Sequence, residues 1–168
     1  MCDGREEPWE DTEDGSNLLE YLLENDKSFT TLELCDKSIS DGGAFALSCM
    51  MQNNKTLREL SIKNSDIGNA GAIAIAGVLN QRDTGLVSLS LCSNRIGDVG
   101  AVALARALET NETLKKLDLC DNFIGGRGAR AFAEMRKKNN TLIWLEMARN
   151  NIGAAENLAL YGPERERT

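Results

Sequence analysis

The sequence predicts a short, curved α/β solenoid with a parallel sheet on its concave side and helices on its convex side. Similar lines of 28 or 29 residues follow one another, and each line holds an alternating apolar run and then an alanine-rich run. One strand and one helix cannot bury their own apolar faces, whereas stacked copies can. The five lines begin at Phe29, Leu57, Leu86, Leu114 and Leu142.

The first part of each line has the pattern of a strand with one buried face. In the third line, apolar side chains stand at the first, fourth, sixth and eleventh places, as Leu86, Leu89, Leu91 and Ile96. The same places are apolar in the other four lines. The alternation around Leu89 and Leu91 predicts a strand whose leucines point inward.

The second part of each line has the pattern of an amphipathic helix. In GAVALARALE, the apolar residues Ala101, Leu104, Ala105 and Leu108 recur at helical spacing. A glycine also recurs in the first helical turn, where we expect the backbone of a neighbour to approach closely. These glycines are Gly43, Gly71, Gly100 and Gly128.

The two ends of the chain depart from the repeat. Residues 1–15 are acidic and predict a disordered tail, residues 16–28 predict a half-repeat cap helix, and 29–161 hold the five repeats. Ala154 and Glu156 replace the usual N-cap residue and the repeat glycine, and Pro163 stops the helix. We therefore expect a short last helix, a weakly covered C-terminal sheet edge and a charged tail over 162–168.

Composition excludes several classes of function. The net charge of −7 disfavours nucleic-acid binding, and no apolar run is long enough to insert into a membrane. Five cysteines without disulfide spacing and an acidic N-terminus predict a cytoplasmic protein. The N-x-T strings at Asn54, Asn111 and Asn139 are therefore interpreted as loop residues.

Catalytic chemistry is hard to assemble from these residues. The chain has no histidine, and no glycine-rich phosphate loop joins a strand to a helix, so we expect neither an enzyme nor a cofactor. Cys35, Cys92 and Cys120 share the seventh place of their lines. Cys92 and Cys120 fall on adjacent strands, where a disulfide or a shared metal is the alternative to small strand-end residues. We expect these cysteines to be small residues that fit the strand ends, and we expect no bound metal.

The pattern LxxLxLxxNxIGxxGAxALAxAL over residues 18–160 resembles the ribonuclease-inhibitor-like class of leucine-rich repeats. That class also occurs in NOD-like receptors, the GTPase activator of Ran and tropomodulin-type actin caps. The resemblance implies an asparagine ladder, in which the ninth residue of each line turns inward and bonds neighbouring backbone. Asn94, Asn122 and Asn150 match this place, whereas Lys37 and Ser65 depart from it.

Two surfaces are candidate partner sites. Trp144, Glu146 and Arg149 are expected near the concave C-terminal edge, where an exposed tryptophan suits a binding hot spot. The alternative is that the Trp144 ring folds over the edge of the sheet.

The second surface is an apolar strip at the seventeenth place, formed by Phe45, Ile73 and Val102. It could dock a partner, hold the N-terminal tail through Trp9, or simply make lateral contacts between neighbouring helices.

The sequence thus predicts a noncatalytic protein–protein interaction module, either a scaffold or a small subunit of a larger assembly. The alternatives are a regulator of an enzyme such as a small GTPase, and a cytoskeletal capping or ciliary component.

Overall fold

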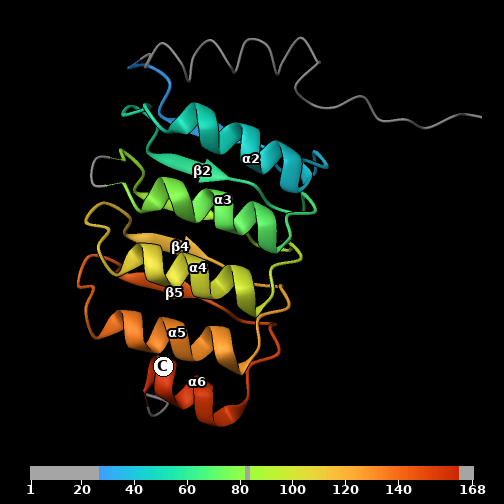
Figure 1. Ribbon diagram of the computed structural model, residues 1–168, viewed down its shortest axis with the longest axis vertical. Coiled ribbons are helices and arrows are strands. Elements are labelled where there is room, and N and C mark those ends of the chain that lie inside the picture. Colours follow the sequence, from blue (N-terminus) through green and yellow to red (C-terminus); the bar gives the residue numbers. More distant parts are fainter. Residues whose placement is uncertain (1–26, 82–83, 163–168) are drawn as a thin grey trace, which may run out of the picture.

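A computed structural model describes residues 27–81 and 84–162, and it confirms the predicted α/β solenoid (Figure 1). The expected acidic tail, nearly all of the expected cap helix and residues 163–168 lie outside the described residues. No helix in the described ranges is long and apolar enough to cross a membrane. The elements are β1 (Thr31–Glu33), α2 (Ser40–Met51), β2 (Glu59–Ser61), α3 (Asn69–Leu79), β3 (Ser88–Ser90), α4 (Asp98–Leu108), β4 (Lys116–Asp118), α5 (Gly126–Arg136), β5 (Trp144–Glu146) and α6 (Ala154–Tyr161).

The five strands form one parallel sheet in chain order, β1-β2-β3-β4-β5. The register places equivalent leucines beside one another, so that Leu60 pairs with Leu89, and Leu117 with Leu145. The helices stack in the same order and cover one face of the sheet (Figure 1). Each strand therefore has one buried residue between two that face away from the helices.

The core is a continuous layer between the sheet and the helices. Each strand contributes its central leucine. The helices contribute further side chains, and three of these are fully buried: Leu47, Leu104 and Phe132. Because neighbouring repeats share this layer, no repeat has a core of its own. Their stability is therefore coupled from one repeat to the next.

Glycine in the first helical turn is required by close packing. A Cβ at Gly128 would lie 2.6 Å from Ile124 Cγ2 and 2.8 Å from Ala101 Cβ, and one at Gly100 would lie 2.8 Å from Ala72 Cβ. Such distances are too short for any side chain, so these glycines let α4 and α5 begin directly against the preceding helix. The atoms they approach belong to side chains, whereas the sequence led us to expect backbone.

Candidate functional site

Asn94, Asn122 and Asn150 bond the backbone of two repeats at once. The Asn122 Nδ2 donates to Leu91 O of the preceding repeat at 2.9 Å, and its Oδ1 accepts from Ile96 N at 3.0 Å. The other two asparagines bond the equivalent groups one repeat before and one repeat after. These bonds satisfy polar backbone groups that the strand-to-helix turns leave unpaired.

The two departures from the asparagine pattern behave differently. Ser65 is fully buried, and its hydroxyl lies 2.9 Å from Leu34 O and 2.8 Å from Lys63 O. It therefore reaches the preceding repeat with a shorter side chain. Lys37 is exposed, so the first repeat has no inward side chain at this place.

A second asparagine column was missed by the sequence interpretation. Asn54, Asn111 and Asn139 lie in helix-to-strand turns, as expected, but they are buried rather than exposed loop residues. Asn139 Nδ2 donates to Leu108 O at 2.6 Å, and its Oδ1 accepts from Leu142 N at 2.8 Å. The missed signal was the fixed place of these asparagines, three residues before the first leucine of the next line.

Helices α3, α4 and α5 are capped from the preceding repeat, so the interpretation of the polar residue at the place of Ala154 as the N-cap of its own helix was wrong. Gly125 occupies the N-cap place of α5, and Asp98 at the start of α4 accepts from the backbone N–H groups of Gly125 and Gly128, both at 2.8 Å. Asp41 and Asn69 cap α3 and α4 in the same way. Each cap therefore links two repeats.

Replacing Asp98 with alanine should lower the free energy of unfolding by about 0.5–2 kcal/mol, because α5 loses its side-chain cap. The measurement is urea unfolding. Glu112→Ala is the matched control, since it removes the same charge from an exposed site with no bond to other described residues. A loss equal to that of the control would contradict capping across repeats.

The C-terminal helix α6 departs from this scheme, and it is short, as expected. Gly126 stands where Asp98 stands one repeat earlier, so it has no side chain to cap α6. Glu156 replaces the repeat glycine and pairs with Arg130 Nη1 at 2.6 Å. Leu160 is buried, and the Arg136 guanidinium lies 5.5 Å from the centre of the Tyr161 ring. A few side chains therefore hold α6 against α5.

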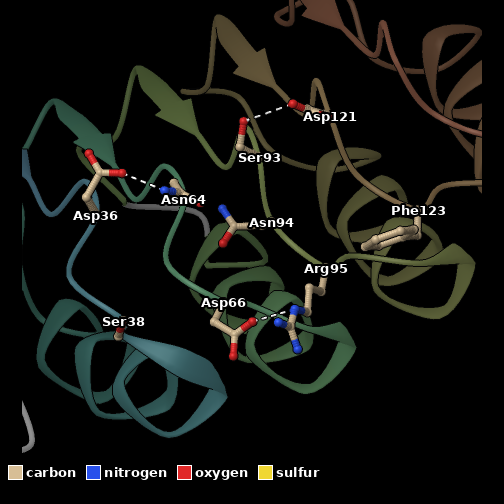
Figure 2. Close-up of a pocket in the computed structure, with 9 residues that line it drawn as sticks. All are labelled: Asp36, Ser38, Asn64, Asp66, Ser93, Asn94, Arg95, Asp121 and Phe123. Atoms are coloured by element: carbon tan, nitrogen blue, oxygen red, sulfur yellow. Dashed lines mark hydrogen bonds and ion pairs between the residues drawn. The ribbon is translucent and has the colours of Figure 1, made fainter. Parts of the chain in front are cut away.

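A shallow pocket of about 580 Å³ lies along the strand-to-helix loops (Figure 2). Asp36, Asn64, Ser93 and Asp121 line it with left-handed backbone conformations, which asparagine and aspartate tolerate well. Asn64 Nδ2 donates to Asp36 Oδ1 at 2.6 Å, and Ser93 Oγ to Asp121 Oδ2 at 3.3 Å (Figure 2). Most of the polar side chains that line the pocket are thus already paired with side chains of neighbouring repeats.

The predicted concave site lies on β5 and the loop that follows it. Trp144 is 44% exposed, Glu146 is half-buried, and Arg149 is exposed with a φ of 54°. Glu146 Oε1 accepts from its own Met147 and Ala148 N–H groups, both at 3.1 Å. In the described residues, β5 has a strand neighbour on one side only, β4.

The predicted convex strip is exposed at two of its three residues. Phe45 is 63% exposed and Ile73 47%, whereas Val102 is half-buried. On α4 the exposed apolar side chain is instead Val99, at 55%. The strip therefore runs across α2, α3 and α4, with Val99 as a member that the sequence interpretation missed.

The cysteines of the described residues are free thiols: Cys35, Cys49, Cys92 and Cys120. Burial and the nearby Asp118 carboxylate raise the pKa of Cys120 from 9.0 to about 12. Because the thiolate is the form that attacks disulfides and binds metals, Cys120 is poorly suited to redox or metal chemistry. No three His, Cys, Asp or Glu side chains of the described ranges gather as metal ligands.

The raised pKa of Cys120 predicts that stability falls as pH rises above 9. The unfolded chain releases the thiol proton near pH 9, whereas the folded chain holds it until about 12, so the unfolded state binds fewer protons in this window. Urea unfolding between these pH values should therefore show a shallower decline for Cys120→Ser than for the wild type. Equal slopes would contradict the assignment.

Comparison with known proteins identifies the repeat. Residues 53–76, 83–105 and 110–133 match the family described as Leucine Rich repeat, so these three segments of the solenoid are similar to leucine-rich repeats. Such repeats are protein-interaction surfaces. A search of curated protein sequences finds no match to this chain.

Two solved structures share the fold. The first, described as Leiomodin-1 Actin-Binding Site 2, is 26% identical with a TM-score of 0.75, over 86% of this chain and 83% of that chain. The second is the tropomodulin C-terminal domain of Caenorhabditis elegans, 13% identical with a TM-score of 0.74, over 86% of this chain and 87% of that one. The second likeness concerns the fold alone.

Proposed function

We propose that this chain is a noncatalytic protein-binding module, a scaffold or small subunit of a larger assembly, whose contact includes Trp144, Glu146 and Arg149. The observation that carries this proposal is Trp144 on β5, a tryptophan that is 44% exposed. Tryptophan is the residue type most enriched at binding hot spots. We assign the repeats to the ribonuclease-inhibitor-like class and the protein to the cytoplasm.

The edge strand makes this end of the sheet suitable for a partner. Only one side of β5 is paired with a strand in the described residues, and α6 lacks the side-chain cap that α3, α4 and α5 receive. A partner could bury the Trp144 ring and the neighbouring edge together.

Rigidity supports binding rather than catalysis. Asparagine side chains tie each repeat to the next, so little conformational entropy is lost when this surface is covered. The chain has no histidine, and the Cys120 thiol stays protonated at physiological pH.

The test is affinity capture from a native extract, with bound proteins quantified by mass spectrometry. We expect Trp144→Ala to lose at least one protein that the wild type retains. Ile143→Ala is the matched control, because Ile143 is the preceding residue, is 72% exposed and lies outside the strand. Equal retention by the wild type and Trp144→Ala would contradict the proposed contact.

Actin is the second candidate partner. The 26% identical structure of similar fold is described as an actin-binding site of leiomodin-1, which favours a cytoskeletal role over regulation of a small GTPase. Co-sedimentation with filamentous actin tests this role. Pelleting of the wild type and Ile143→Ala, but not Trp144→Ala, would support it, and no pelleting of the wild type would exclude this partner while leaving the capture experiment valid.

A further inference from the structure

The outer faces of α2, α3 and α4 form one apolar surface, here called the convex strip and defined by Phe45, Ile73, Val99 and Val102. Around them the exposed positions of α2 and α3 are small or uncharged, such as Gly42, Ala70 and Gly77. The Asp41 side chain is already bonded to the Gly68 and Gly71 N–H groups. Large exposed apolar side chains on three adjacent helices are more than the scattered ones of an ordinary surface.

Arginines bound the convex strip on its C-terminal side. Arg106 follows Val102 by one helical turn on α4, and Arg127 holds on α5 the place that Val99 holds on α4. Both are exposed, and neither has an ion-pair partner among the described residues. Arg130, by contrast, is paired with Glu156. The strip therefore suits an acidic segment with an apolar anchor.

The chain carries such a segment outside the described residues. MCDGREEPWEDTEDG, residues 1–15, contains seven acidic residues, one arginine and Trp9. We propose that this segment covers the convex strip of its own chain, with the Trp9 ring against Phe45 and Ile73 and its carboxylates facing Arg106 and Arg127.

The tether is long enough for this contact. With residues 16–28 in the expected cap helix, Trp9 precedes Ser16 by seven residues, an extended reach of about 23 Å. The outer surfaces of three neighbouring helices span only about 20 Å, at interaxial distances of roughly 8–10 Å. A tether of this length also holds the segment at an effective concentration near the millimolar range, so a weak contact suffices. This favours the chain's own segment over a second copy.

Opposite charges strengthen the argument. The first 28 residues carry ten acidic and two basic side chains, whereas 29–168 carry sixteen and seventeen. Residues 1–15, which we place beside these two arginines, carry seven acidic side chains and one basic, a net charge of −6 against −7 for the whole chain. The convex strip and β5 lie on opposite faces of the molecule, so this contact is independent of the proposed partner site at Trp144.

Tryptophan fluorescence of the full chain tests the proposal. The chain has two tryptophans, so Trp144→Phe leaves Trp9 as the only tryptophan emitter. We expect Trp9 to emit at shorter wavelength than in the free peptide 1–15, and acrylamide to quench it severalfold less. Adding Phe45→Ser and Ile73→Ser should restore the emission of the peptide, whereas Ile143→Ser should not.

Two further measurements decide between occupants. Arg106→Glu with Arg127→Glu leaves the apolar residues in place and should also expose Trp9, as should high salt. A blue shift that disappears on dilution would mean coverage by a second copy and would overturn the proposal. Emission equal to that of the free peptide in the Trp144→Phe chain would show that the strip is open, and would overturn it as well.

Discussion

Replacing Phe132 with alanine is expected to lower the free energy of unfolding by about 3–5 kcal/mol, the largest effect of any single substitution considered. Phe132 is fully buried and is the largest such side chain of the described residues. It lies on α5, where Leu104 of α4 and Ile75 of α3 hold the equivalent places. Because its neighbours belong to a core shared between repeats, they cannot collapse freely into the cavity.

The matched control is Phe123→Ala, which removes the same atoms from an exposed loop residue. Surface substitutions of this kind usually change stability by less than about 0.5 kcal/mol. Urea unfolding followed by circular dichroism measures both variants. Similar losses for Phe132→Ala and Phe123→Ala would contradict the burial of Phe132 in a shared core.

Replacing Asn122 with alanine is expected to cost about 1–3 kcal/mol, because it leaves buried backbone groups without partners. The amide bonds Leu91 O at 2.9 Å, Cys120 O at 3.0 Å and Ile96 N at 3.0 Å. These groups are enclosed by the core, so water cannot replace the lost side chain.

Lys37→Ala is the control for Asn122→Ala, since Lys37 holds the same place in the first repeat but is exposed. It should change the free energy of unfolding little. Equal effects of the two substitutions in urea would mean that the asparagine column does not stabilise the solenoid.

The repeat explains why the fold could be predicted from the sequence. Alternation at Leu89 and Leu91 predicts a strand, helical spacing at Leu104 and Leu108 predicts a helix, and recurrence of both predicts stacking. All of these signals are local and are reinforced by each further copy. The parallel sheet in chain order follows from them.

Contacts that cross repeat boundaries were harder to predict. The usual rule seeks a helix cap in the residue just before the helix, whereas Asp98 caps the helix of the following repeat. Likewise, Asn139 looks like a polar loop residue, but it reaches Leu108 O of the preceding repeat. Such partners are about 28 residues apart, so no local pattern identifies them.

The convex strip and the loop pocket were also hard to predict, because their geometry depends on more than the local sequence pattern. The exposure of Val99, rather than Val102, depends on how far α4 is rotated against its neighbours, which the periodicity of one helix does not fix. The loop pocket depends on left-handed backbone at Asp36 and Asp121, which several turn residues can adopt. By contrast, Trp144 could be placed on the open face, because strand alternation determines its direction.

Hydrogen exchange of the isolated chain tests most directly whether the C-terminal end of the sheet is a binding site. We expect residues 142–160 to exchange fastest among the five repeats, because in the described residues β5 has a strand neighbour on one side only and α6 lacks a side-chain cap. The same residues should become protected once a captured partner is bound. Protection in the isolated chain equal to that of residues 86–113 would show that this edge needs no partner, and would contradict the account.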